Sequence, residues 1–163
     1  MKPEDYRSLV EILRRTLDEI SILHDLLLQE SQALTGRLVD EIDSVAKQKQ
    51  GSVNRIQHQT NLQNSFFESK QFPGRETGLN RYLEQFGDED PDLLELRTYP
   101  EKIQSCVQQC KALNERNGAR IELMNRHTRR AIDLLRNQGH QPDTYGPDGN
   151  TRQNPVSRAR ISV

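Results

Sequence analysis

The side chains that could bind a metal ion or act as nucleophiles are few in this sequence, and most stand far apart. Cys106 and Cys110 are separated by four residues, which places them one turn apart on a helix. A tetrahedral metal site would need two further ligands at a suitable spacing. The histidines do not supply them, because they are scattered: His24, His58, His127 and His140. We therefore expect no metal and no cofactor, and interpret the cysteines as small buried side chains.

The local patterns that position catalytic groups are also missing. The sequence has no glycine-rich phosphate loop, no nucleophile elbow and no carboxylate pair at a strand end. His127 stands between Arg126 and Thr128, where solvent is its expected neighbour. We therefore predict that the protein is not an enzyme.

Composition favours a narrow core. Apolar residues make up 33% of the 163 residues, charged residues make up 29%, and there is no Trp. A compact sphere of this length needs more apolar side chains. The chain is therefore either partly disordered or an elongated helical bundle. Periodicity favours the bundle for a domain at 1–139 and disorder for a tail at 140–163. Without an export signal or a run of about 18 apolar residues, we expect a cytoplasmic protein that is not membrane-inserted.

Charge is distributed unequally along the chain. Residues 111–163 hold ten Lys and Arg against five Asp and Glu, a net charge of +5, whereas residues 1–110 hold thirteen against nineteen, a net charge of −6. Such asymmetry indicates either an anionic partner or two solvated faces. Acidic residues are interleaved with the arginines of the last helix, and no aromatic side chain stands among them for stacking on bases. We therefore expect no nucleic-acid partner.

The first seventy residues predict two amphipathic helices. Residues 4–33 carry apolar side chains at steps of one, three, four or seven, namely Leu9, Ile12, Leu13, Leu17, Ile20, Leu23, Leu27 and Leu34. Gly36 is the expected break, because glycine accepts a left-handed turn. Residues 39–70 continue with a thinner stripe: Ile42, Val45, Val53, Ile56, Leu62, Phe66 and Phe67. We favour an antiparallel hairpin over a single long helix with a kink at Gly36.

The remaining helices follow a loop at 72–78. A short helix is expected over Leu79–Phe86, ending at Gly87, and Asp90 is the predicted N-cap of the last helix. That helix runs from about Asp92 to Gln138 and is bent or restarted at Pro100. Its predicted heptad seam comprises Ile103, Val107, Cys110, Asn114, Asn117, Ile121, Met124, Thr128, Ala131, Leu135 and Gln138.

Two features of the C-terminal region favour protein binding. Asn114 and Asn117 interrupt the seam, either as a buried polar layer that sets register or as an uncovered part that receives a partner helix. Gly118 fits both interpretations. In the tail, residues 146–149 match a type I turn beside Tyr145, which is either an aromatic anchor for docking or a tyrosine that happens to precede a turn.

These residues resemble the FlgN family of flagellar type III export chaperones. The resemblance is specific over 103–163, where L-N-x-x-N-G and Y-G-x-D-G-x-T occur in order: Leu113-Asn114-Glu115-Arg116-Asn117-Gly118 and Tyr145-Gly146-Pro147-Asp148-Gly149-Asn150-Thr151. Before residue 100 it is general. The chain departs from the family pattern in Pro147, which should stiffen the turn, and in a longer N-terminal half.

The resemblance implies an escort of other proteins. Its expected partners are the C-terminal helices of hook–filament junction proteins, which it keeps from assembling early, and the cytoplasmic domain of the export-gate membrane protein. We expect an all-α, elongated antiparallel bundle of three or four long helices with a disordered C-terminal tail. The alternative is a coiled-coil homodimeric adaptor or structural protein. The predicted client-binding residues are Asn114, Asn117, Gly118, Ile121, Leu123, Met124 and Leu135. The predicted export-gate docking residues are Tyr145, Gly146, Asp148 and Gly149.

Overall fold

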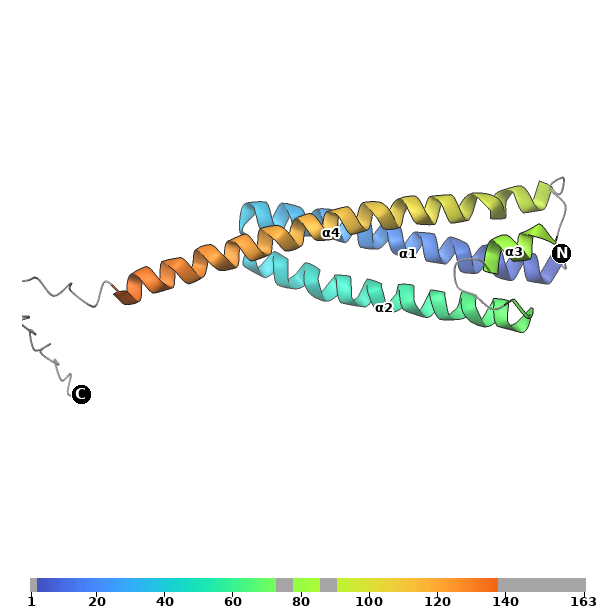
Figure 1. Ribbon diagram of the computed structural model, residues 1–163, viewed down its shortest axis with the longest axis horizontal. Helices are drawn as coiled ribbons and strands as arrows, with labels where there is room; N and C mark the ends of the chain where they lie inside the picture. The colour runs from blue at the N-terminus through green and yellow to red at the C-terminus, as the bar shows by residue number, and fades with distance from the viewer. Residues whose placement is uncertain (1–2, 73–77, 86–90, 138–163) are drawn as a thin grey trace, which may run out of the picture. The chain divides into compact units, whose positions relative to one another are not determined.

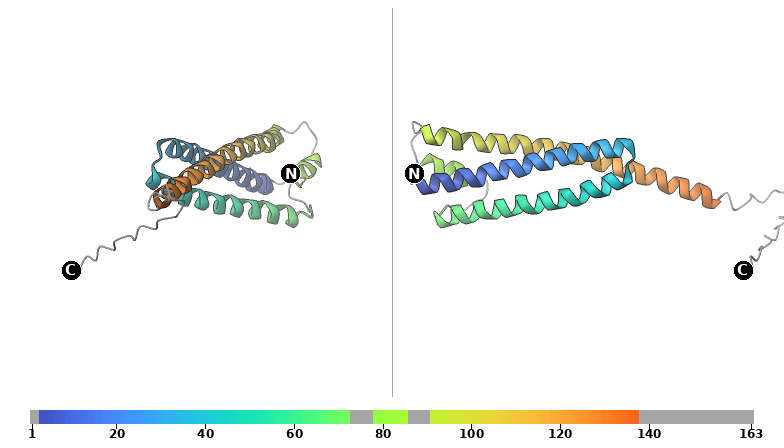
Figure 2. Two further views of the ribbon diagram at one scale, coloured as in Figure 1. Left: turned by 60° about the vertical axis from the view of Figure 1, so that its left-hand side comes forward. Right: turned by 180° about the vertical axis from the view of Figure 1, so that it is seen from behind.

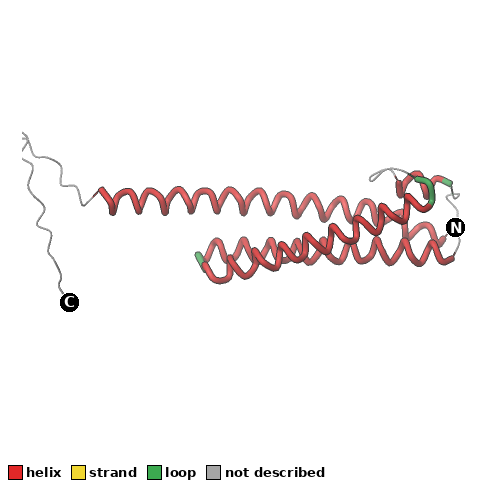
Figure 3. Tube along the Cα trace, turned by 90° about the horizontal axis from the view of Figure 1, so that it is seen from below, coloured by secondary structure: helices red, strands yellow, loops and turns green. Residues whose placement is uncertain are grey.

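The computed structural model of the chain describes residues 3–72, 78–85 and 91–137, and most of these residues are helical (Figure 1). The helices are α1 (Pro3–Gly36), α2 (Val39–Ser69), α3 (Gly78–Glu84) and α4 (Pro91–Asn137). The remaining described residues form short turns and loops (Figure 3). The chain divides into two compact units, residues 1–122 and 123–163. The all-α prediction is confirmed, with three long helices and one short one, whereas the predicted domain boundary and tail lie outside the described residues.

The first two helices form the predicted antiparallel hairpin, in which α1 and α2 lie side by side (Figure 2). The left-handed residue of the turn is Arg37, with φ 56°, and not Gly36 as expected. The Leu38 N–H closes the end of α1 by donating to the Ala33 carbonyl at 3.0 Å. A Cβ on residue 36 would come within 3.2 Å of the exposed Leu38 side chain, which would have to shift slightly to make room for it.

The end of α2 repeats this geometry. Gln71 has φ 63°, and the Phe72 N–H donates to the Phe67 carbonyl at 2.9 Å. The turn brings Phe72 against Tyr82 of α3, with ring centroids 5.6 Å apart in an edge-to-face arrangement. A Cβ on Gly78 would come within 3.3 Å of the Phe67 ring, so the start of α3 needs glycine to pack this closely.

The larger core cluster joins all four helices of the first unit. Its buried members are Leu9 and Leu13 of α1, Phe67 of α2, Leu79, Tyr82 and Leu83 of α3, and Leu93, Leu96 and Tyr99 of α4. The short helix was predicted close to its position, but it begins at Gly78 and ends at Glu84. The predicted end at Phe86 and Gly87 and the predicted N-cap Asp90 lie outside the described residues.

A smaller cluster follows along α1 and α4, with Ile20, Leu27, Cys110 and Leu113 buried. In the first unit α4 runs parallel to α1 and antiparallel to α2, because later residues of α4 meet later residues of α1. The helix continues through Pro100 without restarting. The ring removes only the bond that residue 100 would donate to Leu96, and the helix continues without it.

The inner face of α2 differs from its predicted stripe. Its buried residues are Val45, Ser52, Gln59 and Phe67, whereas Val53 and Leu62 are exposed. Polar side chains therefore occupy two of the four buried positions of this helix. In the described part of the chain, no helix combines the length and apolarity required to cross a membrane.

Candidate functional site

At two places on α4, the residue that packs inward is the one directly before the residue predicted for the seam. Cys106 and Leu113 pack inward, whereas Val107 is 46% exposed and Asn114 is exposed. A shift of one residue turns a side chain by about 100° around the helix. Leu113 takes the inner place because it removes more apolar area from water than Asn114 would.

Asn117 is the last buried residue along α4 and is 1% exposed. Its amide Nδ2 donates to the Leu27 carbonyl at 2.8 Å and to the Glu30 carboxylate at 2.9 Å. No donor among the described residues reaches its Oδ1. In this structure Asn117 is therefore a buried polar contact between α4 and α1.

Glu30 links all three long helices. It is 3% exposed, and Lys49 of α2 donates to its two carboxylate oxygens at 2.7 and 2.8 Å. We call Glu30, Lys49 and Asn117 the polar layer. Nearby, the Arg120 guanidinium donates to the Ser31 hydroxyl at 2.8 Å. Sequence reasoning missed Glu30 and Lys49, although the predicted α1 stripe jumps seven residues, from Leu27 to Leu34, across Glu30.

The other predicted binding residues of the first unit are exposed. Asn114 and Gly118 face solvent, and Ile121 is 36% exposed. A Cβ built on Gly118 would meet nothing within 4 Å. Gly118 therefore leaves this exposed position of α4 without a side chain, whereas the side chain of Asn117 points into the bundle.

The described part of the second unit, residues 123–137, is the C-terminal part of α4. Met124 is half-buried, and the other side chains from 123 to 136 are exposed. Leu135 and Leu134 have exposed fractions of 71% and 65%, and among the exposed large apolar residues Val39, at 67%, is the other one that is exposed to this degree. Exposed apolar residues grouped on one helix are characteristic of an interaction surface.

Helical spacing sorts these residues onto two faces. At about 100° per residue, one face carries Met124, Thr128, Ala131, Ile132 and Leu135. We call this set the apolar stripe. Leu123 and Leu134 lie about 100–120° around the helix from the centre of this stripe, on one flank of it. Leu123 and Leu135, both predicted to bind the client, are therefore not on one face of the helix.

The same segment is basic. Residues 123–137 contain four arginines and one acidic residue, a net charge of +3: Arg126, Arg129, Arg130, Arg136 and Asp133. By the same spacing Arg129 and Arg136 border the apolar stripe. A partner helix lying on the stripe would therefore meet two positive charges along one of its edges.

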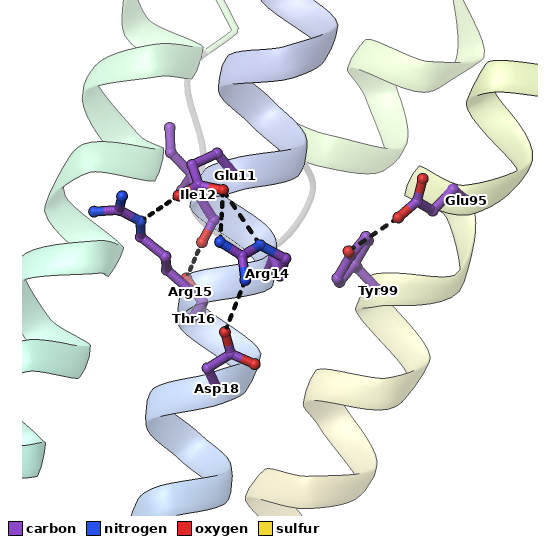
Figure 4. A network of polar contacts seen from close by, with 8 residues as sticks. All are labelled: Glu11, Ile12, Arg14, Arg15, Thr16, Asp18, Glu95 and Tyr99. Atoms are coloured by element: carbon purple, nitrogen blue, oxygen red, sulfur yellow. Dashed lines mark hydrogen bonds and ion pairs between the residues drawn. The ribbon is translucent and has the colours of Figure 1, made fainter.

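The remaining reactive and charged groups have structural explanations. Burial raises the pKa of the Cys110 thiol to about 11, which keeps it protonated and unreactive. On the exposed face of α1, hydrogen bonds from Arg14 and then Arg15 lower the pKa of Glu11 (Figure 4). Tyr99 donates to Glu95 at 3.2 Å. Exposed networks of this kind contribute little to stability. No group of three metal-ligating residues occurs in the described ranges.

The predicted docking motif cannot be placed from the structure. Tyr145, Gly146, Asp148 and Gly149 lie in 138–163, outside the described residues. Their role remains a prediction.

The fold and the exposed face of α4 define a small helical-bundle protein. Comparison with known families gives the assignment: a family model described as FlgN protein matches residues 1–153, and the chain therefore belongs to the FlgN family. This is a family of flagellar export chaperones. No curated protein and no solved structure matches the chain.

Proposed function

We propose that this chaperone binds the C-terminal helices of hook–filament junction proteins through the apolar stripe of residues 124–135, keeps these clients from assembling early in the cytoplasm, and escorts them to the export gate. The observation that carries the proposal is the exposed apolar face of this segment. An amphipathic client helix would cover it by placing its own apolar residues, spaced by three and four, along the stripe.

Charge favours an acidic client over a second copy of the chain. Two copies of residues 123–137 packed together would bring net charges of +3 and +3 into contact. Like charges that meet in an interface oppose association, whereas acidic residues at the edge of a client helix would pair with Arg129 and Arg136. We therefore prefer a client helix that is neutral or acidic, and the homodimeric adaptor remains the second candidate.

Asn114, Gly118 and Ile121 are exposed in the first unit, and their contribution to client binding is a separate prediction. Asn117 differs from them, because it could contact a client only after leaving the polar layer. At the export gate we propose that Tyr145 is the docking residue. Replacing Tyr145 by Ala is expected to keep client binding and abolish export, and an equal loss of client binding would place Tyr145 in the client site instead.

The stripe can be tested with two neighbouring leucines. Leu135→Ala removes a stripe side chain, and Leu134→Ala is the matched control, because it makes the same change at similar exposure on another face. Covering a leucine contributes about 1.5–3 kcal/mol, so we expect Leu135→Ala to weaken client binding about tenfold. The control should change it by less than about twofold. The measurement is calorimetric titration of the full chain with a client C-terminal peptide.

Two outcomes would oppose the proposal. Equal losses in both variants would show that the stripe is not the contact surface, and no complex at micromolar peptide would oppose client binding altogether. Light scattering of the free chain tests the second candidate: a stable dimer that Leu135→Ala converts to monomer would support the homodimeric adaptor.

A further inference from the structure

The attachment of α4 to the rest of the first unit changes along its length. Up to Tyr99, the helix contributes Leu93, Leu96 and Tyr99 to the larger core cluster, where they pack among residues of α1, α2 and α3. From residue 104 to residue 122, the buried side chains are only Cys110, Leu113 and Asn117. A cluster of large apolar side chains from all four helices therefore anchors the first part, whereas one leucine, one thiol and one amide are the buried side chains of the second.

We propose that residues 104–122 of α4 form a strap that lifts from the α1–α2 hairpin while the rest of the first unit stays folded, and that the polar layer is the latch that sets how often it lifts. This inference does not depend on the proposed client or on its binding face. It follows from which side chains contact the strap in the closed form and from how their polar groups are satisfied after the strap has lifted.

Lifting the strap leaves no buried charge without its partner. Glu30 belongs to α1 and Lys49 to α2, so their ion pair stays within the hairpin when Asn117 departs. A buried pair is costly to break because one charge is left uncompensated, and this cost does not arise here. Asn117 would gain water at its Oδ1, which no donor among the described residues reaches in the closed form.

The other contacts of the strap are also weak. The Sγ of Cys110 makes a long contact, 3.7 Å, to the Ile20 carbonyl, and Arg120 is an exposed side chain. An open groove of about 560 Å³ borders the strap between α1 and α4, lined in part by Leu17, Ser21 and Cys106. Water thus already reaches one edge of the interface that would separate.

A hinge is available at the start of the strap. Pro100 lies inside α4, where its ring removes one helical hydrogen bond and makes this turn the easiest to bend. It stands between the anchored residue Tyr99 and the strap. Bending there would move residues 104–122 without disturbing Leu93 and Leu96 in the larger cluster.

Cys110 provides a natural probe for this opening. It is 7% exposed beneath the strap, and in the Cys106→Ser variant of the full chain it is the only thiol. We expect iodoacetamide to label it through the opened form. Its labelling should indicate an opening constant about tenfold or more above the global unfolding constant from urea titration. Low urea should change this rate less than it changes global unfolding, because lifting exposes only part of the surface that unfolding exposes.

The latch is tested by the same substitution at two asparagines of α4. Asn117→Asp puts a carboxylate against Glu30 and removes a donor, and we expect it to speed Cys110 labelling about tenfold. Asn114→Asp makes the same change at an exposed site and should alter the rate by less than about twofold. Asn117→Leu should slow labelling about fivefold without lowering the urea midpoint, because an apolar side chain in that place has no desolvated amide.

The proposal is overturned if labelling of Cys110 follows global unfolding, with the same constant and the same urea dependence. Equal acceleration by the two Asp variants, after correction for their unfolding constants, would also overturn it. Should Asn117→Asp fail to fold, Asn117→Leu decides the question, since labelling at the parent rate would show that Asn117 does not set how often the strap lifts.

Discussion

Replacing Glu30 by Met should lower the free energy of unfolding by more than the loss of an exposed ion pair would. Glu30 is 3% exposed and accepts three hydrogen bonds, two from Lys49 and one from Asn117. Removing one partner of a buried ion pair costs about 3–5 kcal/mol. The Lys49 side chain is 21% exposed and can turn partly to water, so we expect about 2–3 kcal/mol for Glu30→Met.

The double variant Glu30→Met with Lys49→Met should recover most of this loss. Two methionines of similar length fill the space without a buried charge, so its free energy of unfolding should lie within about 1 kcal/mol of the parent or above it. Lys49→Met alone should cost at least as much as Glu30→Met, because it leaves a carboxylate with less access to water. The assay is urea unfolding followed by circular dichroism, with all variants at one pH and salt concentration.

A second ion pair between the same helices provides the control. Arg55 and Glu19 are 2.8 Å apart, like the first pair, but their side chains are 52% and 19% exposed. Glu19→Met should therefore cost less than about 1 kcal/mol. The reasoning is refuted if Glu30→Met costs no more than Glu19→Met, or if the double variant loses as much as its two single variants added together.

Three further predictions concern the turn, the core and the buried thiol. Arg37→Gly should raise the free energy of unfolding by about 0.5–1 kcal/mol in urea titration, because glycine adopts φ 56° without strain; an unchanged or lower value would contradict this. Leu13→Ala, at a fully buried position, should cost about 3–4 kcal/mol by the same measurement, and a loss below about 1 kcal/mol would show that this end of the bundle is loosely packed. Cys110 binds its proton more tightly when folded, with a pKa of about 11 against 9.0, so its contribution to stability is complete below pH 9 and is lost as pH rises toward 11. The loss of stability between these pH values should be smaller in Cys110→Ala, and an equal loss would exclude the thiol as its cause.

The parts of the fold that could be predicted are those with large, regularly spaced apolar side chains. The stripe of α1 predicted its buried face, since Leu9, Leu13, Ile20 and Leu27 all lie in the core. The turn after α1 was expected at the right place, but the left-handed residue is Arg37. Glycine at 36 instead lies close to the side chain of Leu38, which a Cβ would approach within 3.2 Å.

The parts that could not be predicted depend on polar or small residues whose spacing permits more than one face. On α4, Cys106 and Val107 are equally plausible seam residues, and the decision comes from packing against α1. On α2, the polar residues Ser52 and Gln59 are buried on the same face as Val45 and Phe67. Pairs such as Glu30 with Lys49 join separate helices, so no local pattern places them together.

The exposed apolar stripe has a further consequence for how residues 123–137 stay ordered. A separate peptide of about fifteen residues would be at most marginally helical in water, because the first turn is costly to form. Here that nucleus already exists, since α4 begins at Pro91 and is packed before this segment is reached. Each later residue needs only helix propagation, which is close to neutral in free energy. The helical and unfolded forms of this segment are therefore close in free energy. A substitution that breaks the helical hydrogen bonds just before it, such as Glu122→Pro, would unfold the segment and disrupt the apolar stripe without replacing any residue of the stripe.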